Sequence, residues 1–146
     1  MNISAFTPFS SARTKKSYQP PGSIEHKETD THHLPIQVTH FRFKEFSAEE
    51  EKLTPAEVHP DLLEDGYVHW INVDGLHDTK TIEQMGLRFH LHPLTIEDIV
   101  SPDQRAKFEE YDNYGVIMLK MLYLEGEIKT EQLCIVLTPH AVLTFQ

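Results

Sequence analysis

The chain has 146 residues, which is the length of one domain able to bury a core of its own. Its 23 acidic and 13 basic residues give a formal net charge of −10, which repels the phosphates of nucleic acids and attracts cations. No run reaches the roughly 18–20 apolar residues of a membrane-spanning helix, and the single cysteine, Cys134, excludes an internal disulfide. We therefore expect a soluble protein of a reducing compartment, with no nucleic acid as partner.

Residues 1–22 are predicted to form a flexible tail. They contain no acid and three basic residues, and they close with the turn-forming sequence Pro-Pro-Gly. An organellar transit peptide is the alternative interpretation, which the small number of basic residues disfavours. Residues 23–146 then form one domain, and this domain carries the acidic charge.

The first half of the domain alternates between strand and helix patterns. Residues 34–43, LPIQVTHFRF, alternate as a strand does, and residues 47–53, SAEEEKL, have the serine cap and early acids of a helix start. Residues 67–73, YVHWINV, are apolar on both faces, which predicts a strand inside a sheet that is covered on both sides. After Asp78, a predicted N-cap, apolar residues recur at helical spacing, so a helix should return over the sheet.

The segment HPLTIEDIV, residues 92–100, is predicted to be a short helix. His92 occupies the cap position and Pro93 the first helical position, and Pro102 should end the helix near Ser101. Apolar side chains gather on one side, and the adjacent acids Glu97 and Asp98 are expected to face outward. Both acids then lie in the last turn, where the helix dipole disfavours negative charge by about 0.3–1 kcal/mol each. Another interaction must therefore favour acids at this position.

The second half predicts three antiparallel strands in a meander. The strand patterns cover residues 114–124, 130–137 and 141–146, and turns are expected at residues 125–126 and 139–140. The last strand is apolar and ends at Gln146 without a polar tail or covering helix. We therefore expect this chain to be part of a longer protein.

Three stretches resemble, in order and spacing, the N-terminal cytoplasmic domain of the CorA family of divalent-cation transporters. They are WINVDGLHDTKTIEQMGLRFHLHPLTIEDIV, QRAKFEEYDNYGVIMLKM and EQLCIVLTPHAVLTFQ. The resemblance is close over residues 70–146 and begins more loosely near Pro20. Its most specific part is Gly-Leu-His at 75–77 followed by F-x-L-H-P-L-x-x-E-D-I from Phe89 to Ile99. One departure is Ala106, where the family often has proline.

The resemblance implies an α/β fold, a mixed sheet between helical layers (an α/β/α sandwich), truncated before a stalk helix and two membrane helices. It also implies a magnesium or cobalt ion transporter at the cytoplasmic face of the inner membrane, assembled as a homopentamer from copies of the same subunit. The stalk, the membrane helices and the family's Gly-Met-Asn pore signature do not occur in these 146 residues. This chain alone is therefore not expected to conduct ions or to be an enzyme.

The resemblance assigns Glu97 and Asp98 to a regulatory Mg²⁺ site between subunits, with Co²⁺ also possible as the ion. Mg²⁺ prefers six oxygen ligands and often keeps several waters, so one or two carboxylates from each partner suffice. The two side chains diverge by about 100° on the helix. We therefore expect Asp98 to lead at one site and Glu97 to assist at another. A solvated acidic face without ligand is the alternative.

Other readings remain open. The ten histidines suggest a zinc site using His90 and His92 with His77 or His32 and His33, yet no zinc-enzyme motif accompanies them. A zinc-transporting relative of the same superfamily and a stand-alone module without the channel fit the same sequence. Glu109, Glu110 and Asp112 form a candidate secondary cation patch, which is more typical of a solvated surface.

Overall fold

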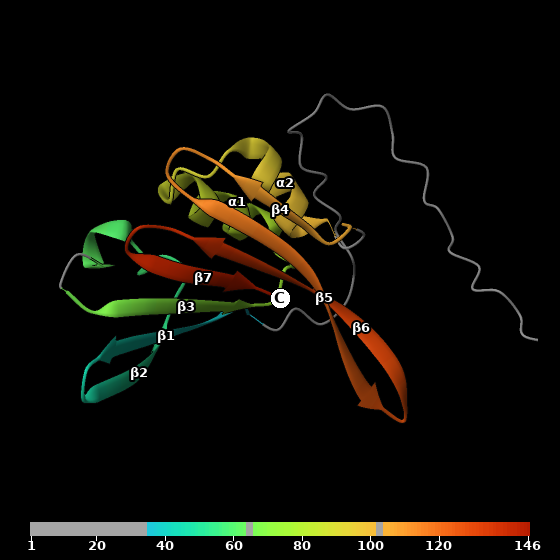
Figure 1. Ribbon diagram of the computed structural model, residues 1–146, viewed down its shortest axis with the longest axis horizontal. Coiled ribbons are helices and arrows are strands. Elements are labelled where there is room, and N and C mark those ends of the chain that lie inside the picture. The colour runs from blue at the N-terminus through green and yellow to red at the C-terminus, as the bar shows by residue number, and fades with distance from the viewer. Residues whose placement is uncertain (1–34, 64–65, 102–103) are drawn as a thin grey trace, which may run out of the picture.

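A computed structural model describes residues 35–63, 66–101 and 104–146 of the chain (Figure 1). The predicted tail, residues 1–22, and His32 and His33 lie outside the described residues. Seven strands and two α-helices occur in the order β1 (Gln37–Lys44), β2 (Ser47–Leu53), β3 (Val68–Asp74), α1 (Thr79–Arg88), α2 (Pro93–Val100), β4 (Lys107–Glu110), β5 (Gly115–Glu125), β6 (Glu127–Leu137) and β7 (Ala141–Phe145). A short 3₁₀ helix, η1 (Pro60–Leu63), precedes β3.

The seven strands form one mixed sheet in the order β2-β1-β3-β7-β6-β5-β4. The strands β5, β6 and β7 form the predicted antiparallel meander. The last strand, β7, then pairs in parallel with β3, with Ile71 opposite Leu143. All other pairs are antiparallel. The mixed sheet predicted from the sequence is therefore confirmed, and β3 lies near its middle.

The two helices cover one face of this sheet and form the core with it. Ile82 and Met85 of α1 and Ile96 and Ile99 of α2 are buried. The sheet contributes alternate residues of its strands, which are Val38, Ile71, Val73, Val116, Met118, Cys134, Val136, Leu143 and Phe145. Helices α1 and α2 approach closely at Gly86, where an added Cβ would lie 2.7 Å from Cγ1 of Ile96. The glycine therefore sets the spacing of the helix pair.

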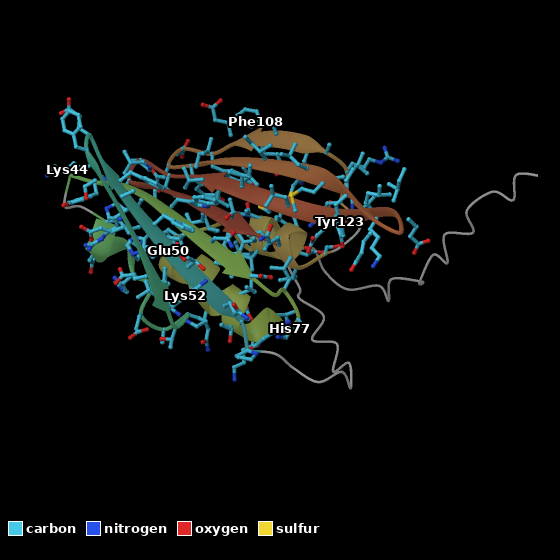
Figure 2. The ribbon with its side chains drawn as sticks, turned by 90° about the horizontal axis from the view of Figure 1, so that it is seen from below. Lys44, Glu50, Lys52, His77, Phe108 and Tyr123 are labelled. Atoms are coloured by element: carbon cyan, nitrogen blue, oxygen red, sulfur yellow. The ribbon has the colours of Figure 1, made fainter. Side chains whose placement is uncertain are left out.

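The opposite face of the sheet is apolar and lies open in the described residues. Trp70 and Phe43 are both 37% exposed, and Phe108 is 63% exposed. Figure 2 shows the helices on one side of the sheet and Phe108 on the other. A sheet covered on both sides was predicted around β3, whereas within the described residues helices cover only one side.

The secondary structure differs from the sequence prediction in two segments. Residues 47–53 form strand β2, not a helix, because they pair along their full length with β1 through a two-residue turn at Glu45 and Phe46. The sequence pattern also gave no signal for β4, which pairs with β5. Both are edge strands with charged side chains, a composition that discourages further pairing and hides the period-two pattern.

Candidate functional site

Helix α2 begins as predicted. The His92 side chain accepts a hydrogen bond from the backbone N–H of Leu94, and Pro93 follows at the first helical position. Tyr114, at the entry to β5, holds this end of the helix from the sheet side. Its hydroxyl accepts from the backbone N–H of His92 at 2.8 Å and lies 3.1 Å from the Thr95 hydroxyl. The amino end of α2 is thus fixed to the sheet.

The carboxyl end of α2 is closed by Gln132 of β6, which is 7% exposed. Its amide Nε2 donates to the backbone carbonyls of Asp98 and Ser101 at 3.2 and 2.9 Å. Its Oε1 accepts from the backbone N–H of Gln104 at 3.1 Å. These bonds add partners to carbonyls at the helix end, of which that of Asp98 also accepts from the backbone N–H of Ser101 at 3.3 Å. The turn that carries Glu97 and Asp98 is therefore held at a defined place on the sheet.

The helical spacing predicted that Asp98 faces open solvent, and the structure differs. Its side chain is 19% exposed, and its Oδ2 accepts a hydrogen bond of 2.5 Å from Nζ of Lys107. Lys107 lies on β4 in register with Met118, which in turn lies opposite Cys134. Side chains of the strands at this edge of the sheet therefore lie beside the helix, and they largely enclose the Asp98 side chain. Glu97 is also only partly exposed.

A buried thiol, Cys134, lies beside this site. Burial, and next the negative charge of Asp98, raise the pKa of Cys134 to about 12, while the charge of Lys107 acts in the opposite direction. Cys134 is therefore a neutral, packed side chain.

The oxygen donors at the end of α2 suit a hard cation, and they supply only part of a shell. Two adjacent carboxylates fit the preference of Mg²⁺ for one or two protein carboxylates and several waters. Within the described ranges, no group of three or more histidine, cysteine, aspartate or glutamate side chains is placed to hold a metal ion. A site here must therefore be completed by water or by groups from outside the described residues.

The histidines suggested for zinc have other places in the fold. His92 caps α2 and its ring stacks on Tyr111, and His90 has a positive φ of 56° directly after α1. Among the described residues, neither histidine lies in a cluster of three or more side chains that could bind a metal ion. The secondary patch is also divided, because Glu109 contacts Lys107 and Tyr111.

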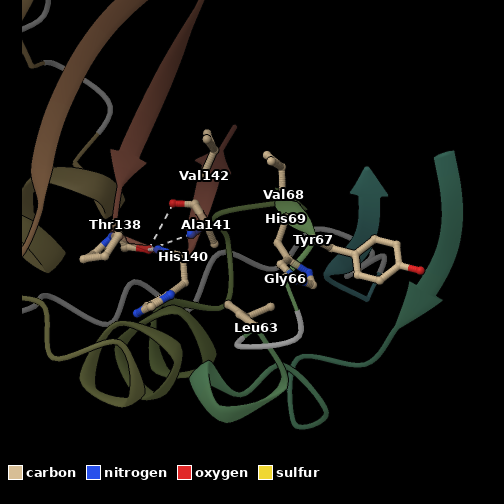
Figure 3. Close-up of a pocket in the computed structure, with 10 residues that line it drawn as sticks. Leu63, Gly66, Tyr67, Val68, His69, Thr138, His140, Ala141 and Val142 are labelled. Carbon is tan, nitrogen blue, oxygen red and sulfur yellow. Dashed lines mark hydrogen bonds between the residues drawn. The ribbon is translucent and has the colours of Figure 1, made fainter. Parts of the chain in front are cut away.

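A buried histidine pair lies beside a surface hollow of the molecule. His40 and His69 are almost inaccessible, and their Nε2 and Nδ1 atoms are 2.9 Å apart. The other ring nitrogen of His40 lies 2.9 Å from Oε1 of Glu51. His69 and His140 help line a hollow of about 420 Å³, shown in Figure 3. The Thr138 hydroxyl in this hollow bonds to the backbone of Ala141 and thus closes the turn before β7.

The fold and the site define an α/β domain that presents paired carboxylates at a rigidly held helix end. The family described as "CorA-like Mg2+ transporter protein" matches residues 65–146, and the chain belongs to this family. The described residues contain no helix of the length and apolarity required to cross a membrane.

Two curated relatives are similar to this chain in sequence. The chain is 34% identical over 130 residues to the cobalt/magnesium transport protein CorA of Thermotoga maritima, which covers 87% of this chain and 36% of that protein. It is 35% identical over 77 residues to the putative metal ion transporter YfjQ of Bacillus subtilis, with 53% of this chain and 24% of that protein covered. The chain thus spans about a third or less of these relatives.

Solved structures share the fold. The soluble domain of CorA from Methanocaldococcus jannaschii superposes with a TM-score of 0.53 at 16% identity, covering 75% of this chain and 39% of that one. The full-length CmaX protein gives a TM-score of 0.59 at 8% identity, covering 79% and 36%. The α/β architecture with a mixed sheet is confirmed by these neighbours.

Proposed function

We propose that this chain is the Mg²⁺-sensing domain of a CorA-type transporter of magnesium or cobalt ions at the cytoplasmic face of the cell membrane. In this proposal the domain ends at a stalk and membrane helices that these 146 residues do not contain. Copies of the subunit assemble as a homopentamer, and residues 23–146 form the regulatory domain. The open apolar face of the sheet is then the surface that a second helical layer covers.

The observation that carries this proposal is the position of Glu97 and Asp98. Both acids lie in the last turn of a helix that is tied to the sheet at both ends, so the backbone that carries them keeps a fixed place on the sheet. A cation that bridges such a turn to a neighbouring subunit binds one arrangement of subunits better than another. Mg²⁺ would in this way shift the population toward the closed state, and loss of Mg²⁺ would release the subunits to open.

The test uses a transporter subunit that contains this domain, in a membrane or in detergent. The Asp98→Asn substitution removes one negative charge and keeps the size of the side chain, and Glu97→Gln does the same beside it. We expect Asp98→Asn to assemble normally and to lose most of the protection that Mg²⁺ gives against a protease, with a smaller loss for Glu97→Gln. Glu50→Gln, on the exposed edge strand β2, is the control and should keep full protection. Full protection of the Asp98→Asn assembly would contradict the proposal.

A further inference from the structure

The Asp98 carboxylate already has a cation of its own. Nζ of Lys107 lies 2.5 Å from Oδ2 of Asp98, and both side chains are largely enclosed, with 28% and 19% of their surfaces exposed. A Mg²⁺ ion binds carboxylate oxygens at about 2.0–2.1 Å. An ammonium group at hydrogen-bond distance occupies the same region around the oxygen, and two cations so close repel each other. A metal ion that uses this oxygen must therefore displace the lysine.

Lys107 has a second carboxylate within reach. Glu109 lies two residues further along β4, on the same face of the strand, and its Oε1 is 3.1 Å from Nζ of Lys107. The Tyr111 hydroxyl donates to the other oxygen of Glu109 at 3.4 Å and helps to orient it. Lys107 can thus leave Asp98 and still keep an ionic partner. The ammonium group thus contacts Asp98 and Glu109 at the same time, and Glu109 alone could hold it if Asp98 were taken by another cation.

The lysine is a full charge at neutral pH. The ordinary pKa of a lysine side chain, about 10.4, lies far above neutral pH. The ammonium group is therefore a cation that the fold holds beside Asp98 and that competes there with Mg²⁺.

We propose that Lys107 is a tethered competitor of the divalent cation at Asp98, which moves to Glu109 when Mg²⁺ binds and so sets the Mg²⁺ concentration at which the site fills. This inference rests on the proposed function, because it takes Asp98 as the Mg²⁺ ligand. A ligand that must displace an internal group binds with an apparent affinity reduced by the fraction of open site. The device would keep the site empty at low Mg²⁺ without a change in its ligands.

The experiment is a Mg²⁺ titration of the 146-residue chain, followed through the backbone amide resonances of α2 in 0.15 M KCl. Lys107→Met removes the charge and keeps the aliphatic stem, and it should lower the half-saturating Mg²⁺ concentration about fivefold to tenfold. Lys107→Arg keeps the charge and should stay near the wild type. Lys129→Met is the matched control, because Lys129 forms an equally short ion pair with Glu125 on the β5–β6 hairpin. It should leave the titration unchanged.

The Glu109→Gln variant tests the second position of the lysine. With this carboxylate removed, Lys107 has only Asp98 as partner, so more Mg²⁺ should be needed. In a Lys107→Met background the same Glu109→Gln change should have little effect, because no ammonium group needs the second position. If Glu109 acts only through its general negative charge, Glu109→Gln should change the half-saturating Mg²⁺ concentration equally in both backgrounds. That result would overturn the proposed movement of Lys107 to Glu109.

Thermal unfolding separates competition from a merely structural role. In EDTA the Lys107→Met chain should melt below the wild type, and added Mg²⁺ should raise its melting temperature more than that of the wild type. An equal deficit at every Mg²⁺ concentration would overturn the proposal. Lys107→Gln replaces the methionine variant if the latter does not fold.

Asp98→Asn separates this proposal from the proposed function. If it abolishes the Mg²⁺ response while Lys107→Met leaves the affinity of the chain unchanged, Asp98 is the ligand and the competition is wrong. If Asp98→Asn leaves the response intact in both the wild-type and Lys107→Met backgrounds, the assignment of Asp98 itself is wrong.

Discussion

Lys107 and Asp98 are nine residues apart in sequence, and their charged groups meet at 2.5 Å across the junction of β4 and α2. This contact explains why Asp98 is tolerated in the last turn of a helix, where the helix dipole disfavours negative charge. Lys107 supplies there the positive charge that the negative end of the helix dipole favours. Lys107 therefore compensates the unfavourable interaction of the Asp98 charge with the helix dipole, without a metal ion.

The ion pair should contribute measurably to stability. In a double-mutant cycle with Lys107→Met and Asp98→Asn, we expect a coupling energy of about 0.5–2 kcal/mol from urea unfolding at neutral pH without Mg²⁺. The partial exposure of both groups keeps the value below that of a fully buried pair. The corresponding cycle for Lys129 and Glu125, which are more exposed, should give at most about 0.5 kcal/mol. Similar coupling in the two cycles would contradict this ranking.

Asp78 should stabilise the start of α1 in a pH-dependent way. Its side chain accepts hydrogen bonds from the hydroxyl and the backbone N–H of Thr81, and the hydroxyl bond is the main reason why the pKa of Asp78 is lowered from its ordinary value of 3.8. Because the folded state lowers this pKa, the stabilisation is complete above the ordinary value and is lost as the pH falls through the lowered one.

Two substitutions of Asp78 separate the cap from its charge. Asp78→Ala should lower the free energy of unfolding at pH 7 by about 1 kcal/mol, because the cap is lost. Asp78→Asn should keep most of the cap and, compared with the wild type, lose less stability between pH 5 and pH 3. Urea unfolding at several pH values measures both effects. An Asp78→Ala chain as stable as the wild type would show that the cap contributes nothing.

The Cys134 thiol should be inert in the folded protein. It is fully buried, and its pKa of about 12 leaves almost no thiolate at pH 8. Because the thiolate is the reactive form, we expect modification by a disulfide reagent to proceed only through unfolding. The rate should rise by orders of magnitude in 6 M guanidinium chloride. Rapid modification of the native chain would mean that β6 opens locally.

Gly86 should be sensitive to even the smallest enlargement. An alanine Cβ there would come within 2.8 Å of two atoms of Ile96, so α1 and α2 would have to move apart or Ile96 would have to change rotamer. We expect Gly86→Ala to lower the free energy of unfolding by about 1–3 kcal/mol despite the better helix propensity of alanine. Gln84→Ala, on the exposed side of the same helix, is the control and should change stability by less than about 0.5 kcal/mol. A stabilised Gly86→Ala chain would contradict the close approach of the helices.

Helix starts, caps and turns could be predicted from the sequence alone, because their signals lie in neighbouring residues. His92 and Pro93 define the start of α2, Asp78 caps α1, and the turns at residues 125–126 and 139–140 separate the strands of the meander. Caps, prolines and turns act through neighbouring backbone groups, so they can be read without knowledge of the fold. The family resemblance also came from the sequence, and the comparison over residues 65–146 confirmed it.

The edge strands and the surroundings of Asp98 could not be predicted from the sequence, because they depend on how the elements pack together. Residues 47–53 carry the local signs of a helix start, but pairing with β1 made them β2, because a backbone ladder along a whole strand outweighs a weak helix propensity. The helical spacing placed Asp98 on the outer side of α2, whereas the position of β4 brought Lys107 against it. Such a contact depends on how the helix packs against the edge of the sheet, and the periodicity of residues along the helix does not indicate it.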